Sequence, residues 1–277
     1  MTVKQQTIKK PIEYTGIGLH SGQPVTMTLK PAPVNTGIVF IRTDIDGHPS
    51  VKADIKNVTN TMRATTLEDG EAKVFTVEHV MAAFSGMGVD NCYVEMNSPE
   101  PPVGDGASTV FVGLIEEAGL VEQEADRRVH VIKKMHAIYD GDRFVIALPY
   151  EDYRITFTSV NSHPLLGTQQ SDVIITADSF KKEIASARTI GFVKELEQLQ
   201  AMGLAKGGSL ENALVYDDDK CLSVPRFDDE LVRHKSLDVM GDLYLLGPIK
   251  GHIIAQKSSH ELNSRLSRSI VQEIEED

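Results

Sequence analysis

TVEHVMAAFSGMG, residues 76–88, is the stretch at which the β-rich first third of the chain changes to helix. Thr76 is expected to cap the N-terminus of this helix, because a threonine hydroxyl can accept a backbone N–H of the first turn. Gly86 or Gly88 is expected to end it, since glycine readily adopts the left-handed conformation that closes many helices. The first turn of the helix carries the adjacent pair Glu78 and His79.

The remaining segments are predicted to repeat one order of elements in two halves: strands, helix, strand, helix. The predicted strands are residues 7–14, 25–32, 37–44, 90–98, 129–140, 143–150, 153–160 and 251–257. The predicted helices are residues 77–88 after Thr76, 109–120 after Ser108, 178–187, 227–247 and 261–270. Strands do not alternate regularly with helices, which argues against a doubly wound sheet. We therefore predict an α+β fold of two similar domains, each a sheet layered with helices, with the helices packed between the two sheets.

A polar stretch, EQEADRR at residues 122–128, is the predicted boundary between these domains. The domains then cover residues 1–124 and 125–277. The second domain carries an insert at about residues 191–219, in which Phe192, Leu199 and Met202 fall near helical spacing, so a short helix is predicted there. Packing onto the domain is the usual reason for such an apolar stripe, and a groove for an acyl chain is the alternative.

Composition excludes several classes of protein. The 277 residues carry a formal net charge of −12, whereas nucleic acids and anionic membranes call for a basic face. No stretch approaches the roughly 20 apolar residues of a membrane span, and the N-terminus lacks the apolar core of a signal peptide. Cys92 and Cys221 form no metal-binding or disulfide pattern. We expect a cytoplasmic protein, and a monomer.

The chain carries a candidate metal site in two pieces. His234 and Asp238 are four residues apart in the predicted helix 227–247, so both project from one face. Alone, this spacing is better explained by a solvated histidine–aspartate pair on a helix face. With His79 added, two histidines and a carboxylate would hold a catalytic zinc and leave one coordination position open. The two helices must meet for this to happen, and no HExxH motif is present to guarantee it.

Two further side chains are candidates for acid–base chemistry. Glu78 lies about 100° around the helix from His79, so it could flank a water molecule at the metal and act as its base. A surface carboxylate at a helix start is the alternative for this residue. Ser258 and Glu261 are expected to form a capping box that places His260 in the first turn of the last helix. The helix dipole disfavours a protonated histidine there, so a protonated His260 needs a carboxylate nearby, and Asp242 is the candidate.

Eight segments together resemble one family, the UDP-3-O-acyl-N-acetylglucosamine deacetylases, which are zinc amidases of lipid A biosynthesis. The segments run through nearly the whole chain and read TGIGLHSG, LKPAPVNTGIVF, TVEHVMAA, PEPPVGDGAS, ARTIGF, LAKGGS, RHKSLDVMGDL and SSHELN. The resemblance implies two α+β domains with the active site between them, and an acylated UDP-amino sugar as the substrate. The implied metal is Zn²⁺, although a His₂Asp site can also take Fe²⁺.

The same resemblance implies a role for each matched residue. His79, His234 and Asp238 match the zinc ligands. Glu78 matches the general base, His260 the general acid, and Asp242 the partner that keeps His260 charged. Thr189 matches a hydroxyl that stabilises the tetrahedral oxyanion, and Lys235 a cation placed against the carbonyl and phosphate region of the substrate. The residues matched to substrate binding, besides Lys235, are Ile190, Phe192, Leu199, Met202 and Ser209.

The chain departs from the family pattern at two places that bear on the substrate or the metal. Ile190 stands where many members have phenylalanine, which removes an aromatic wall. Ala64 and the pair Ala205 and Lys206 stand near positions where cysteines are frequent. Two other functions remain open: a catalytically idle zinc or sugar-nucleotide binding protein, and a zinc hydrolase with a different substrate.

Overall fold

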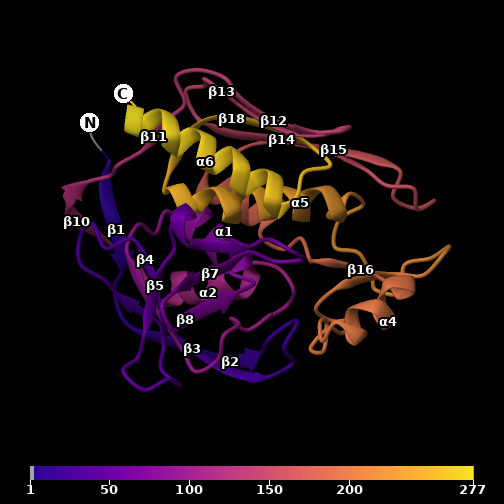
Figure 1. Cartoon of the computed structure of the whole chain (residues 1–277), viewed down its shortest axis with the longest axis horizontal. Helices are drawn as coiled ribbons and strands as arrows, with labels where there is room; N and C mark the ends of the chain where they lie inside the picture. Colours follow the sequence, from indigo (N-terminus) through magenta and orange to yellow (C-terminus); the bar gives the residue numbers. More distant parts are fainter. Residues whose placement is uncertain (1–2, 277) are drawn as a thin grey trace.

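A computed structural model describes residues 3–276 of the chain, and the side chains of residues 3–272. The fold is α+β, as predicted, with helices lying between two groups of strands (Figure 1). None of the helices within residues 3–276 has the length and hydropathy needed to span a membrane.

The first half of the chain builds a mixed five-stranded sheet with strand order β2-β3-β9-β4-β5. Its strands are β2 (Ile12–Ile17), β3 (Pro24–Pro31), β9 (Cys92–Met96), β4 (Ile38–Arg42) and β5 (Ser50–Lys52). A smaller sheet joins β6 (Val58–Asn60), β7 (Thr66–Asp69) and β8 (Ala72–Phe75), and a third pairs β1 (Lys4–Ile8) with β10 (Leu120–Asp126). The helices of this half are α1 (Glu78–Met87) and α2 (Thr109–Ala118).

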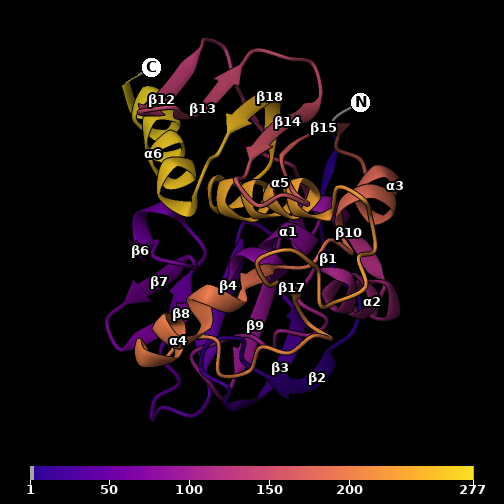
Figure 2. The ribbon, with the colours of Figure 1, turned by 90° about the vertical axis from the view of Figure 1, so that its right-hand side faces the viewer.

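The second half builds a sheet with strand order β12-β13-β18-β14-β15, to which the short β11 (His130–Val131) is added through β18. Its strands are β12 (His136–Asp140), β13 (Arg143–Leu148), β18 (Ile249–Gln256), β14 (Tyr153–Val160) and β15 (Thr168–Ile174). Helices α5 (Glu230–Leu243) and α6 (His260–Glu276) lie on this sheet (Figures 1 and 2). The short helix α3 (Ala177–Ser179) follows β15 in the chain. The insert contains β16 (Ile190–Phe192), α4 (Val193–Ala201) and β17 (Leu214–Tyr216), so the predicted short helix is present.

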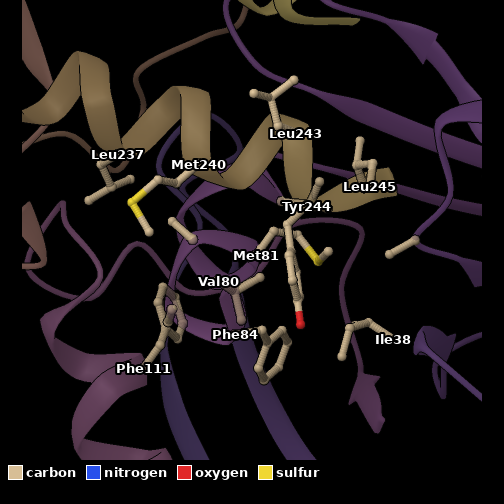
Figure 3. Packing of buried hydrophobic residues seen from close by; sticks show 14 of the residues in the cluster. Ile38, Val80, Met81, Phe84, Phe111, Leu237, Met240, Leu243, Tyr244 and Leu245 are labelled. Atoms are coloured by element: carbon tan, nitrogen blue, oxygen red, sulfur yellow. The ribbon is translucent and has the colours of Figure 1, made fainter. Parts of the chain in front are cut away.

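Helices α1 and α5 pack against each other and join the two halves in one core. Figure 3 shows their buried apolar side chains interlocking with those of α2 and of the segment after α5, among them Val80, Met81, Phe84, Phe111, Leu237, Met240, Leu243 and Tyr244. Phe84 is fully buried, so its truncation to alanine would cost about 3–5 kcal/mol of stability. Gly241 of α5 lies against the backbone of Glu78, where an added Cβ would collide with the Glu78 carbonyl. The helices therefore cross closely at the residues that begin α1.

Three expectations about the strands and the first helix are wrong. Thr76 does not cap α1: Val77 is the residue before the helix, and the Thr76 hydroxyl donates instead to Oε1 of the buried Glu100 at 2.9 Å. The predicted strand 7–14 is two strands, β1 and β2, which belong to different sheets. The predicted strand 129–140 is also two strands, β11 and β12, which pair with β18 and β13 respectively. The helix does end at Gly88, as one of the two predicted stops, with φ at 76°.

Candidate metal and acid–base site

The close crossing of α1 and α5 brings together the three predicted metal ligands. His79 comes from the first turn of α1, while His234 and Asp238 come from successive turns of α5, and all three are buried. One ligand atom from each lies within 4.8 Å of the other two. Oδ1 of Asp238 is 3.3 Å from Nε2 of His234 and 3.9 Å from Nε2 of His79. Helices α1 and α5 are in contact, as the predicted metal site requires.

Neighbouring groups orient these three side chains toward one another, and burial favours the neutral form of the two histidines. Nδ1 of His234 is 3.0 Å from the carbonyl oxygen of Ala187, which leaves Nε2 to face Asp238. The Lys235 ammonium donates to Oδ2 of Asp238 at 2.8 Å, so Oδ1 faces the two histidines. Burial, reinforced by the neighbouring His234, lowers the pKa of His79 to about 3. Burial also lowers the pKa of His234.

Asp238 is a carboxylate in this cluster. Burial on its own would raise the pKa of Asp238, but the nearby His234 and Lys235 outweigh it and hold that pKa well below its usual range. Two neutral imidazoles and one carboxylate are a donor set that suits a divalent metal such as zinc. The residues present therefore fit the metal that the family resemblance implies.

Glu78 lies beside this cluster and is 3% exposed. Its Oε2 atom accepts the backbone N–H of Thr65 at 3.1 Å, and its Oε1 atom is 3.8 Å from Nε2 of His260. Burial raises the pKa of Glu78 to about 7, against the opposing charge of His260 and with a further rise from Asp242 and Asp238. The surface-carboxylate alternative does not describe this buried side chain.

His260 is paired with Asp242, the carboxylate expected beside it. Nδ1 of His260 lies 2.8 Å from Oδ2 of Asp242, and Asp242 is 2% exposed. Burial by itself would lower the pKa of His260, but the carboxylates of Asp242 and Glu78 outweigh burial and raise it to about 10. At neutral pH His260 is therefore a cation in this arrangement.

The expected capping box of Ser258 and Glu261 is wrong. The Ser258 hydroxyl donates to Oδ1 of Asn263 at 2.7 Å, whereas the Ser259 hydroxyl accepts the N–H of Leu262 at 3.4 Å. Ser259 is therefore the side chain at the start of α6. Asn263 in turn donates to Oδ2 of Asp242 at 2.8 Å. Ser258 therefore supports Asp242, the partner of His260, through Asn263.

A cavity of about 730 Å³ opens from the metal and acid–base residues toward the insert. Its lining includes Lys235 and Thr189, together with four of the predicted substrate contacts: Ile190, Phe192, Leu199 and Ser209. The fifth, Met202, is 48% exposed and lies outside this lining. His20 also lines the cavity, and its Nδ1 accepts the backbone N–H of Ala205 at 3.3 Å.

Several residues of the site were not predicted. Thr65 donates its hydroxyl to Oδ1 of Asp242 at 2.6 Å, and Asn263 supports the other oxygen. Lys257 and Arg63 add cations to the cavity lining. Asn263 lies three residues after His260 on the same helix, so its spacing could have pointed to it. Thr65 carries no such signal, because it reaches the site only through the tertiary fold.

Comparison with known proteins agrees with the resemblance. Residues 5–272 match the family described as UDP-3-O-acyl N-acetylglycosamine deacetylase. The chain belongs to this family. A curated UDP-3-O-acyl-N-acetylglucosamine deacetylase of Acidithiobacillus ferrooxidans is 47% identical over 274 residues, covering 97% of this chain and 90% of the relative. Proteins of the same description from Marinobacter nauticus and Hahella chejuensis are 45% and 43% identical, each over 97% of this chain and over 90% and 91% of the relative.

Membership of the deacetylase family extends over both halves of the chain, including the insert. The match to the deacetylase relatives, which covers 97% of the chain, and the family match over residues 5–272 span the elements that carry His79 and His234.

Proposed function

We propose that this chain hydrolyses the 2-acetamido group of UDP-3-O-acyl-N-acetylglucosamine, giving acetate and the free 2-amino sugar nucleotide, a step of lipid A biosynthesis. Family membership and the names of the curated relatives support this substrate. The observation that carries the reaction class is the pair of the buried Glu78 and the mostly buried His260, 3.8 Å apart, beside a cluster of two histidines and an aspartate.

His79, His234 and Asp238 would hold the metal, for which Zn²⁺ is the first candidate and Fe²⁺ the second. A bound zinc ion supplies Lewis acidity, which polarises the acetamide carbonyl and makes water a better nucleophile at neutral pH. The Lys235 ammonium contributes to this site by holding Oδ2 of Asp238, so that Oδ1 is kept toward the histidines.

Glu78 and His260 divide the proton transfers. Glu78 accepts the proton of the attacking water. The hydrogen bond from the backbone N–H of Thr65 orients the Glu78 carboxylate for this step. His260, protonated through its contact with Asp242, donates a proton to the sugar nitrogen as the C–N bond breaks. Without that proton the amine would be a very poor leaving group. Two groups with different charge states at one pH are what this reaction requires.

The cavity lining matches the other parts of the substrate. Thr189 and Lys235 both line the cavity, and in this proposal they stabilise negative charge on the former carbonyl oxygen. Lys257 and Arg63 also line the cavity, where they pair with Asp142 and Glu195, and these two cations are our candidates for contacts to the diphosphate. The apolar lining contributed by the insert, including Phe192 and Leu199, suits the 3-O-acyl chain. Met202 as a substrate contact remains a prediction from the sequence.

Two alternatives are distinguished by one assay. An idle binding protein needs metal ligands but gains nothing from a buried base such as Glu78, and a hydrolase of another acetamido compound needs no apolar cavity. Acetate release should be measured from UDP-3-O-acyl-N-acetylglucosamine and from UDP-N-acetylglucosamine, which lacks the acyl chain. We expect efficient release from the acylated compound alone. Equal rates would favour the altered substrate, and no release from either would favour the binding protein.

The division into domains at residues 1–124 and 125–277 is part of this proposal, since it sets His79 in one domain and His234 in the other. The cytoplasmic location and the monomeric state also stay predictions from composition.

A further inference from the structure

We propose that Thr65 is a positioning residue that sets the orientation of the acid His260 by holding Asp242, an inference that rests on the proposed deacetylation. The Thr65 hydroxyl donates to Oδ1 of Asp242 at 2.6 Å. The backbone N–H of the same residue donates to Oε2 of Glu78 at 3.1 Å. One residue thus contacts both the base and the partner of the acid.

Thr65 is buried where the two halves of the chain meet, and this holds its hydrogen bond to Asp242 in place. Thr65 is 2% exposed and immediately precedes β7 in the smaller sheet of the first half, whereas Asp242 belongs to α5 of the second half. Its hydrogen bond therefore crosses between the two halves at the point where α1 and α5 meet. A hydroxyl that donates to an ionised carboxylate makes a stronger bond than one between neutral groups.

The geometry at Asp242 gives the hydroxyl a specific task. Oδ2 of Asp242 faces Nδ1 of His260 and also accepts from Asn263, both at 2.8 Å. Thr65 is the donor to the other oxygen, Oδ1, among the hydrogen bonds of residues 3–272. Donors on both oxygens fix the rotation of the carboxylate group, and that rotation decides where the His260 ring points. Without the Thr65 hydroxyl, the carboxylate can turn and carry His260 away from the leaving nitrogen.

The test compares variants that differ by the hydroxyl alone. Thr65→Val keeps the branched shape and the backbone N–H to Glu78 but removes the donor to Asp242. We expect kcat for acetate release to fall about 10-fold or more, with KM and bound zinc unchanged, because small misplacements of a catalytic group are costly. Thr65→Ser, which keeps the hydroxyl, should recover most of the lost kcat. Thr66→Val is the matched control: it removes a buried hydroxyl from the next residue, for which no contact to the site is seen in the described residues.

A second pair of variants tests the inference even if Thr65→Val does not fold. Thr65→Ala and Thr65→Ser are both smaller than threonine and differ from each other by the hydroxyl, so any defect from the missing methyl is common to both. Circular dichroism and thermal melts should accompany the rates. Equal kcat for the alanine and serine variants would overturn the inference.

A double-mutant cycle tests the route through Asp242. If Thr65 acts by holding this carboxylate, Thr65→Val should lower kcat much less in an Asp242→Asn background than in wild type. The same fold-loss in both backgrounds would show that Thr65 acts elsewhere and would overturn the inference alone. A wild-type protein that releases no acetate would instead overturn the proposed function.

Discussion

The Nε2 atom of His260 lies 3.8 Å from the Oε1 atom of Glu78, although the two residues come from opposite halves of the chain. Glu78 is buried and His260 mostly buried. Burial raises the pKa of Glu78 and the charge of His260 opposes that rise, whereas the charge of Glu78 helps to raise the pKa of His260. A base and an acid at this separation can act on one small group between them. The crossing of α1 and α5 creates this relationship, so the core of the protein and its chemistry depend on the same helix contact.

Replacing the base should separate metal binding from turnover. Glu78→Gln keeps the shape and an oxygen that can accept the Thr65 N–H, but it cannot take a proton. We expect acetate release to fall by about 10²-fold or more while bound zinc stays at the wild-type level, because a general base contributes on this scale. Rates within a factor of two of wild type, with zinc bound, would remove Glu78 from the mechanism.

Replacing the carboxylate of the metal cluster should have the opposite pattern. Asp238→Ala removes the oxygen that lies near both histidines and also leaves the Lys235 ammonium without its partner. We expect most of the zinc to be lost on gel filtration, measured as metal per chain. Glu122→Ala, at an exposed carboxylate of β10, is the control and should retain metal. Full zinc retention by the Asp238 variant would mean that Asp238 is not a ligand.

The pH dependence of kcat/KM should be bell-shaped. Glu78 must be deprotonated, and its pKa is raised to about 7 by burial, so activity falls as the pH drops. A bound cation would lower that pKa, which places the acidic limb below 7. His260 must be protonated, and its pKa is raised to about 10 by Asp242 and Glu78 against the effect of burial, so activity falls as the pH rises toward that value. Because Glu78 and His260 interact, the apparent pKa values of the two limbs of the profile belong to the pair and not to either residue alone.

Asp242→Asn gives the control for this profile. Removing the carboxylate that faces Nδ1 should lower the pKa of His260 and move the basic limb to lower pH, with the acidic limb changed less. A basic limb that stays in place would show that Asp242 does not keep His260 charged.

The acyl contact can be tested within α4. Leu199 is 9% exposed and lines the cavity, so Leu199→Gln places an amide in an apolar wall. We expect KM for the acylated substrate to rise about 10-fold or more, the scale of a lost apolar contact in a pocket. Glu197→Gln, on an exposed part of the same helix, should leave KM unchanged. A rise in KM for Met202→Gln would support the predicted contact that the cavity lining does not include.

Local rules of sequence were enough to predict the elements that carry the site. The spacing of His234 and Asp238 predicted a shared helix face, and the glycine after Met87 predicted the end of α1. The caps were predicted less well, because tertiary contacts decide them: Glu100 takes the Thr76 hydroxyl and Asn263 takes that of Ser258. Strand 7–14 was predicted as one element although Pro11, which cannot donate to a strand ladder, lies at the break between β1 and β2.

The assembly of the site needed more than local rules. Whether His79 meets His234 depends on the close crossing at Gly241, a contact between distant segments. The family resemblance supplied that pairing, together with roles for Glu78 and His260. Thr65 was missed by both approaches, because a threonine before a strand has no distinguishing pattern and its partner Asp242 is far away in sequence.

The most direct test of the account is acetate release from UDP-3-O-acyl-N-acetylglucosamine by the purified protein as isolated, after chelation, and after zinc is restored. We predict activity that is lost with the metal and regained with zinc, in proportion to the metal bound per chain. Metal-replete protein that releases no acetate, or activity that survives complete removal of the metal, would contradict it.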